Sequence, residues 1–180
     1  VRITYHIMSQ LRIPISLELL ADMETPLSVF KKLGNKPFSY LFESVEGAEK
    51  WARYSLIGLP STTVIKVHKN DIKIFKDNKV IKKFSSPDPL KFLQEYQDKI
   101  EVKPNNELPS FTGGLVGYLG YDCIRYIEPK LSKSNLPDPL GTPDALFMLS
   151  EEVAVFDNLN NKLHLIVLSD SESKSAISKA

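Results

Sequence analysis

The sequence predicts an α+β fold built mostly from antiparallel strands. Apolar runs of strand length are grouped into hairpins by short polar turns. Only two substantial helices interrupt them, expected over 26–33 and 88–100. These helices do not alternate regularly with the strands, as they would around a parallel sheet. Together the three observations favour an antiparallel sheet carrying a few helices.

The first elements are an extended segment and a helix. Residues 1–20 are expected to be extended, with Pro14 breaking the run. The helix over 26–33 has Thr25 as its N-cap, a proline at its first position and apolar residues on one face. Gly34 ends it.

Two further strands are expected over 38–45 and 53–59, which are aromatic and aliphatic runs separated by the charged turn EGAEK. If 38–45 is a strand, Glu43 shares a face with apolar neighbours. A buried carboxylate needs a cationic or donor partner. That partner is either Arg53 or Lys50 across the hairpin, or the ammonium group of a bound small molecule with Ser44 beside it.

The segment 62–84 has the pattern of a hairpin with turns at 70–71 and 77–78. Lysines alternate here with Val, Ile and Phe. Such alternation is typical of a half-buried antiparallel sheet and favours a solvated face over a nucleic-acid surface. The lysines are Lys66, Lys69, Lys73, Lys76, Lys79, Lys82 and Lys83.

The second half completes the pattern. Its final hairpin turn is expected over 158–161. The elements expected before and around that turn are a helix over 88–100, a loop over 101–110, a glycine-interrupted strand from 113, a short helix over about 121–128, an irregular proline-rich segment over 129–143, and apolar runs over 145–157 and 162–169.

Composition excludes several classes of function. The chain has 180 residues, a formal net charge of +1 and one cysteine. The balanced charge provides no global field for nucleic acid or an anionic membrane, and one cysteine forms no internal disulfide or multi-cysteine zinc site. Residues 1–20 have neither a signal-peptide pattern nor a long apolar span, so a cytoplasmic location is expected.

The remaining candidate motifs are weak. The glycines from 113 to 120 lack both the Gly-Lys-Ser/Thr ending of a phosphate loop and the G-x-G-x-x-G spacing. The three histidines are far apart in sequence. Cys123 follows Asp122, whose charge opposes thiolate formation, so a buried structural thiol is expected there.

Two blocks carry a family resemblance. LFESVEGAEKWARYSLIGL at 41–59 and LPSFTGGLVGYLGYDCIRYIE at 108–128 resemble the N-terminal region of the anthranilate synthase component I family, within the chorismate-utilising enzymes. The upstream TPLSVFKKL helix, the LPDPLGTPDA loop and the ALFMLSEEVAVFDNLNNKLHLIV hairpin follow the family order. The likeness covers about residues 13–170.

The resemblance implies a lyase that converts chorismate to anthranilate and pyruvate in tryptophan biosynthesis, requires Mg²⁺ and receives ammonia from a glutamine amidotransferase subunit, component II. It also implies a tryptophan feedback site. The family's Leu-Leu-Glu-Ser segment matches Leu41, Phe42, Glu43 and Ser44, with phenylalanine in place of the second leucine. Tyr54 falls by spacing near another position of that pocket.

The family's chorismate-binding, magnesium-binding and catalytic residues have no counterpart here, so no catalytic residue or metal ligand is assigned. The resemblance implies an N-terminal domain over 1–170, followed over 171–180 by a linker or the start of a C-terminal region. That region would complete an αββα-type sandwich, and the fragment alone is expected to be inactive. Two alternatives remain: the N-terminal domain of aminodeoxychorismate synthase component I, and a stand-alone amino-acid-binding module.

Overall fold

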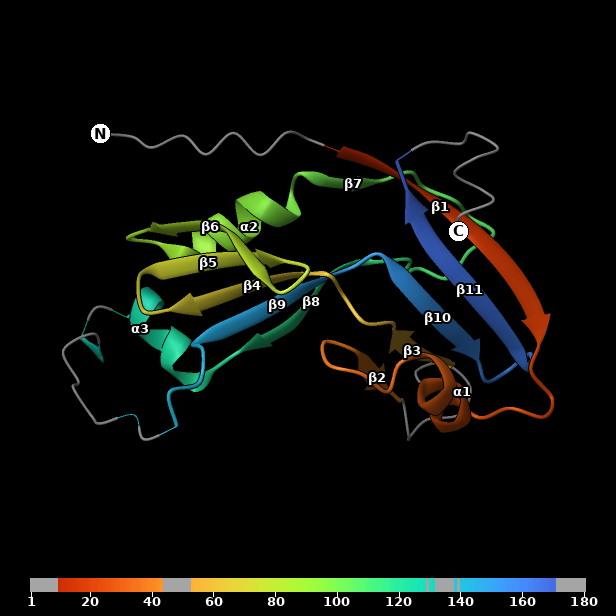
Figure 1. The fold of residues 1–180 in the computed structure, drawn as a ribbon. Helices are drawn as coiled ribbons and strands as arrows, with labels where there is room; N and C mark the ends of the chain where they lie inside the picture. The colour runs from red at the N-terminus through yellow and green to blue at the C-terminus, as the bar shows by residue number, and fades with distance from the viewer. Residues whose placement is uncertain (1–9, 44–52, 129, 132–137, 139, 171–180) are drawn as a thin grey trace. The chain divides into compact units, whose positions relative to one another are not determined.

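A computed structural model describes residues 10–43, 53–128, 130–131, 138 and 140–170. The expected α+β class with mostly antiparallel strands is confirmed (Figure 1). The chain divides into two compact units, and neither unit is continuous in sequence. The first comprises residues 1–61, 99–114 and 150–180, and the second comprises residues 62–98 and 115–149.

The first unit is built on a six-stranded sheet in the order β2-β3-β10-β11-β1-β7. All neighbours are antiparallel except β1 and β7, which run parallel. The strands are β1 (Gln10–Leu20), β2 (Tyr40–Phe42), β3 (Tyr54–Gly58), β7 (Ile100–Val102), β10 (Glu152–Asp157) and β11 (Lys162–Ser169).

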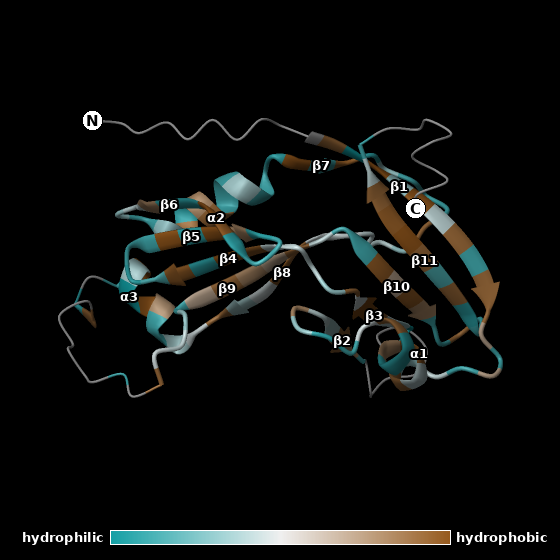
Figure 2. Cartoon of the chain, viewed as in Figure 1, coloured by the Kyte–Doolittle hydropathy of each residue, from teal (hydrophilic) through white to brown (hydrophobic). Residues whose placement is uncertain are grey.

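Successive side chains of a strand point to opposite faces of the sheet, so continuous apolar runs give this sheet two apolar faces. One face carries Ile57, Ala154 and Phe156, which form a buried cluster with Val29 of helix α1 (Pro26–Leu33). The opposite face carries a second cluster, formed by Val153, Val155 and Ile166 with Tyr54, Leu56 and Phe111 packed against it. Figure 2 shows the corresponding apolar bands on β10 and β11.

Helix α1 begins and ends where the sequence predicts. The Thr25 hydroxyl accepts a hydrogen bond from the Ser28 N–H at 3.1 Å, and the Ser28 hydroxyl oxygen accepts one from the Thr25 N–H at 2.9 Å. This reciprocal pair satisfies two of the free donors at the helix start. At the other end, the Gly34 N–H donates to the Phe30 carbonyl at 2.7 Å.

Replacing Thr25 with alanine is expected to lower the free energy of unfolding by about 1 kcal/mol, because the Ser28 N–H loses its acceptor. Chemical denaturation measures the change. Thr25→Ser keeps the acceptor oxygen and should stay close to the parent. Equal losses in both variants would show that the cap contributes nothing.

The second unit has a five-stranded sheet in the order β6-β5-β4-β9-β8. Ile65, Val67, Ile72 and Ile74 are buried on one face, as the alternation predicts. The alternation is incomplete, because Val64 on the other face of β4 is buried and Val80 and Ile81 of β6 are exposed. The elements are β4 (Thr63–His68), β5 (Asp71–Lys76), β6 (Lys79–Ser85), α2 (Pro89–Gln97), β8 (Gly114–Leu119), the 3₁₀ turn η1 (Tyr121–Cys123), α3 (Ile124–Ile127) and β9 (Ala145–Ser150).

The short helix α3 is tied to this sheet by the Tyr126 hydroxyl. It donates to the Lys69 carbonyl at 2.6 Å and lies 3.1 Å from an Asp144 carboxylate oxygen. Burial raises the pKa of the Tyr126 phenol, and the Asp144 charge raises it further. The phenol therefore stays protonated and keeps both contacts at neutral pH.

Three expectations about strands are wrong. Pro14 lies inside β1, opposite Leu168, instead of ending the extended run. The described part of β7 pairs only with residues 10–12, so Pro14 needs no donor on that side. The run 145–157 is two strands in different sheets, and the expected loop 101–110 begins inside β7.

Candidate ligand-binding site

The predicted site residues lie at one edge of the first unit's sheet, on β2 and β3. The strand expected over 38–45 spans only Tyr40–Phe42, so Glu43 follows the strand instead of lying within it. Tyr54 is the first residue of β3. Ser44 lies outside the described residues.

Leu41 and Tyr54 lie on opposite faces of the sheet. Leu41 is opposite Ile57 and packs against the cluster under α1. Tyr54 lies three positions before Ile57 and packs against the other cluster. Phe42, opposite Leu56, shares the Tyr54 face and is 52% exposed. Leu41, one of the predicted tryptophan-binding residues, therefore lies on the α1 face of the sheet, whereas Phe42 lies on the same face as Tyr54.

The expected burial of Glu43 is wrong, because its side chain is exposed beyond the end of β2. Arg53 is not its partner. The Arg53 guanidinium binds Asp157, with Nη2 2.7 Å from Oδ2 and Nε 3.1 Å from the same oxygen. It also lies 4.8 Å from the centre of the Tyr54 ring. Lys50, the other expected partner, lies outside the described residues.

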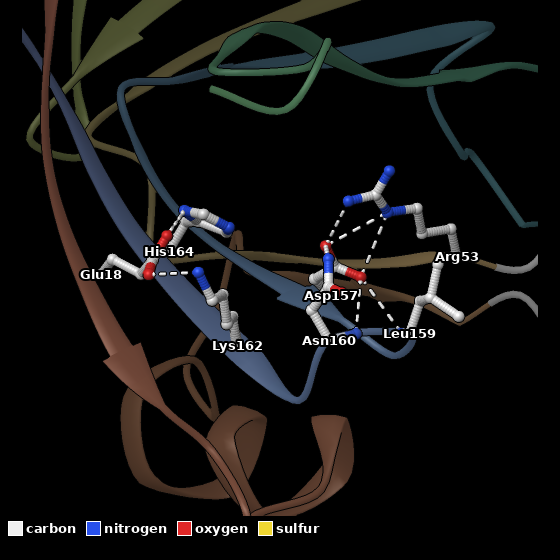
Figure 3. Close-up of polar contacts among 7 residues, drawn as sticks. All are labelled: Glu18, Arg53, Asp157, Leu159, Asn160, Lys162 and His164. Carbon is white, nitrogen blue, oxygen red and sulfur yellow. Dashed lines mark hydrogen bonds and ion pairs between the residues drawn. The ribbon is translucent and has the colours of Figure 1, made fainter. Parts of the chain in front are cut away.

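The Asp157 carboxylate is hydrogen-bonded to three residues near this edge, Arg53, Leu159 and Asn160 (Figure 3). Its side chain is only 2% exposed. Besides the Arg53 guanidinium, it accepts hydrogen bonds from the N–H groups of Leu159 and Asn160 and from the Asn160 side-chain amide, at 2.9–3.2 Å. The carboxylate thus fixes both the β10–β11 turn and the start of β3.

The pKa of Asp157 reflects two opposed causes. Burial raises it, but the hydrogen bonds from Arg53, Asn160 and Leu159 outweigh burial and lower the pKa to about 2. The ion pair also raises the pKa of the Arg53 guanidinium above its ordinary value. The sequence offered one signal for this network: the run Asp157–Asn161 has the composition of a turn closed by an aspartate side chain.

Stability is expected to depend on pH through Asp157. Its folded pKa of about 2 lies below the ordinary value of 3.8, so its contribution is present above pH 4. That contribution, about 2 kcal/mol, is lost as the pH falls towards 2. Urea denaturation at several pH values, with Asp157→Asn as reference, measures it. A parent–variant difference that stays constant between pH 5 and 2 would contradict the assignment.

A second set of charged side chains lies on the same face of the sheet as Asp157, on β1 and β11. The Lys162 ammonium lies 2.6 Å from a Glu18 carboxylate oxygen, and His164 Nδ1 lies 3.9 Å from the other (Figure 3). Hydrogen bonding to Lys162 lowers the pKa of Glu18. Because Glu18 is half-exposed, this pair adds little stability.

No group of three or more His, Cys, Asp or Glu side chains is placed to hold a metal ion within the described ranges. These residues therefore do not fit a magnesium centre. Cys123 is buried, as expected, and donates its thiol hydrogen to the Asp144 carbonyl at 3.0 Å. Burial, followed by the Asp144 charge, raises the pKa of this thiol. None of the helices described is long and apolar enough to cross a membrane.

Comparison with known families gives one match over most of the chain. Residues 40–179 match the family model described as chorismate binding enzyme. The chain is 51% identical over 165 residues to "Anthranilate synthase component 1" of Pseudomonas aeruginosa, which covers 92% of this chain and 34% of that protein. It is 42% identical over 172 residues to the protein of the same name in Neisseria meningitidis, covering 94% and 35%.

A solved structure supports the same relationship. Anthranilate synthase component I from Streptococcus pneumoniae matches with a TM-score of 0.53 and 28% sequence identity. The match covers 89% of this chain and 34% of that one. The chain thus spans about a third of the length of the relatives it matches.

Proposed function

The chain belongs to the chorismate-binding enzyme family, and from that premise we propose that it is the N-terminal part of an anthranilate synthase component I. The observation that carries the proposal is 51% identity to an anthranilate synthase component 1 over 92% of this chain. The complete protein would be a lyase that forms anthranilate and pyruvate from chorismate, the first step of tryptophan biosynthesis.

An uncovered apolar strip supports the view that more polypeptide completes this fold. Leu17 and Leu19 lie opposite Leu165 and Leu163, on the α1 side of the sheet. They are 57% and 41% exposed, and Leu11 on the same side is 53% exposed. A sheet face of this kind is normally buried by a second layer. In this proposal the following polypeptide forms that layer and completes the αββα sandwich.

Catalysis would reside in that further polypeptide. The described residues contain no site that fits Mg²⁺. In this proposal the magnesium ligands and the chorismate-binding residues lie in the further polypeptide, as the family resemblance implies. Residues 1–170 would form the N-terminal domain, with 171–180 leading into the catalytic region. The chain alone would bind no chorismate and make no anthranilate.

The partner of the complete protein would be a glutamine amidotransferase subunit that supplies ammonia. The number "1" in the relatives' name fits an enzyme of two components.

The complete protein would be a cytoplasmic enzyme. The single cysteine, Cys123, is buried and its thiol is not activated, which is consistent with a reaction that does not use this thiol.

Regulation is the part of the function assigned to this chain. The exposed Glu43 carboxylate would bind the ammonium group of tryptophan, and Ser44 would hydrogen-bond its carboxylate or amine. Tyr54 and Phe42 share one face and would offer aromatic surface to the indole. Leu41 would anchor β2 in the core from the other face. Inhibition follows if tryptophan binds one arrangement of the complete enzyme better than another.

The test is anthranilate formation by the complete protein and by residues 1–180. The complete protein with chorismate, Mg²⁺ and ammonium should produce anthranilate, detected by its fluorescence, whereas the fragment should produce none. Formation of aminodeoxychorismate in place of anthranilate would overturn the proposed reaction. Micromolar binding of tryptophan by the fragment, with no chorismate-dependent activity in the complete protein, would indicate a stand-alone binding module.

A further inference from the structure

Strand β2, which leads into the proposed tryptophan site, is only three residues long and lies at the edge of its sheet. Its register decides where Glu43 lies, because a slip by one residue moves every side chain to the other face. Backbone pairing over three residues is weak. Side-chain contacts must therefore hold the observed pairing of Tyr40 with Gly58 and Leu41 with Ile57.

Tyr40 makes two such contacts. Its ring lies directly on the Gly58 backbone: a Cβ added to Gly58 would lie 1.9 Å from a ring carbon of Tyr40. Only glycine leaves room for the ring at that position. The Tyr40 hydroxyl lies 2.9 Å from the Ser150 hydroxyl, and both side chains are buried. The Tyr40 ring therefore fits only against Gly58, and its hydroxyl contacts Ser150.

The residues just before β2 fix its starting point. Phe38 adopts φ 62°, a left-handed conformation that costs a bulky residue about 1–3 kcal/mol. Its carbonyl accepts a hydrogen bond from the Ser61 N–H at 2.9 Å. The Ser39 hydroxyl donates to the Lys36 carbonyl at 2.6 Å, which closes the turn. A strained corner persists only where the surrounding contacts determine it.

We propose that Tyr40, seated on Gly58 and hydrogen-bonded to Ser150, fixes the register of β2 and is thereby a positioning residue for the tryptophan site. The proposal rests on the proposed function, since it concerns the tryptophan-binding role proposed for Glu43. Tyr40 does not contact tryptophan itself. It acts through Leu41 and Phe42, the two residues that separate it from Glu43.

The experiment compares inhibition constants for tryptophan in the complete enzyme. Tyr40→Phe keeps the ring on Gly58 and removes only the hydroxyl. Roughly a three- to tenfold higher inhibition constant is expected, with kcat and the KM for chorismate within about twofold of the parent, since one hydrogen bond is worth about 1 kcal/mol. Ser150→Ala should have the same effect, and the double variant should be no worse than either one.

The matched control is Tyr126→Phe in the second unit. It likewise removes a hydrogen-bonded phenolic hydroxyl, one with two contacts instead of one, from a residue remote in the chain from β2. If Tyr40 has a purely structural role, both variants should melt at a lower temperature than the parent and have the same inhibition constant for tryptophan. The positioning role predicts a raised inhibition constant only for Tyr40→Phe and Ser150→Ala.

Two outcomes overturn the proposal, and they are distinguishable. If Glu43→Gln relieves inhibition but Tyr40→Phe keeps the parent inhibition constant, or matches Tyr126→Phe, Tyr40 has no positioning role. If Glu43→Gln also leaves inhibition unchanged, the tryptophan site itself is misassigned, and the positioning role falls with it.

Discussion

Substituting Glu43 with glutamine is expected to raise the tryptophan concentration for half-maximal inhibition of the complete enzyme by roughly ten- to a hundredfold. A hydrogen bond to a charged group contributes about 1.5–3 kcal/mol, and glutamine keeps the shape while removing the charge. Because Glu43 is exposed and follows β2, its loss should leave the fold intact. The measurement is the rate of anthranilate formation against tryptophan concentration, with each variant's uninhibited rate as its own reference.

Glu95→Gln is the matched control, because Glu95 is an exposed glutamate on α2 in the second unit. It should be inhibited like the parent. Ser44→Phe provides an independent second variant, since a phenyl ring would occupy the space offered to the ligand. If Glu43→Gln and Ser44→Phe both respond to tryptophan like Glu95→Gln, the site lies elsewhere.

Replacing Asp157 with alanine is expected to lower the free energy of unfolding by about 2–3 kcal/mol, the size of the contribution of hydrogen bonds to a charged group. The change leaves Arg53 without its carboxylate partner and removes the acceptor of the Leu159 and Asn160 N–H groups. Chemical denaturation of parent and variant measures the loss. Asp22→Ala, an exposed aspartate in the same unit, should stay within about 0.5 kcal/mol of the parent.

The same network predicts an asymmetry between its two ends. Arg53→Met should cost less than Asp157→Ala, because the remaining N–H donors still satisfy the carboxylate and the Arg53 side chain is 41% exposed. Equal costs would mean that the ion pair, and not the turn, carries the stabilisation. A loss below about 1 kcal/mol for Asp157→Ala would contradict the role given to the buried carboxylate.

Local sequence signals predicted the elements whose boundaries are set locally. Thr25 and Gly34 mark the two ends of α1, and the turns of the 62–84 hairpin fall close to where the polar residues interrupt the alternation. These features depend on neighbours within a few residues. Periodicity and capping residues therefore suffice to find them.

Features that depend on contacts between distant parts of the chain could not be predicted from the sequence. The run 145–157 is interrupted by polar residues at 150–152, but nothing in that short interruption shows that β9 and β10 belong to different sheets. Arg53 and Asp157 are far apart in the chain and meet only through the β3–β10 pairing. That pairing gives Arg53 a partner other than Glu43.

The sequence predicted which residues form the candidate site, but it did not predict how the Glu43 side chain is placed. A strand over 38–45 would have buried Glu43, whereas β2 ends at Phe42 and leaves the carboxylate exposed. An exposed carboxylate needs no internal partner, so it is available to a ligand. The case for Glu43 therefore no longer depends on a burial penalty and depends instead on its position after a strand of fixed register.

The most direct test of the tryptophan site is a crystal structure of the complete protein with tryptophan bound. The expected result is tryptophan beside the end of β2, with its amino nitrogen about 3 Å from a Glu43 carboxylate oxygen and its indole against the Tyr54 face of the sheet. Tryptophan bound at a position that contacts neither Glu43 nor Ser44 would contradict the assignment of the feedback site to this chain.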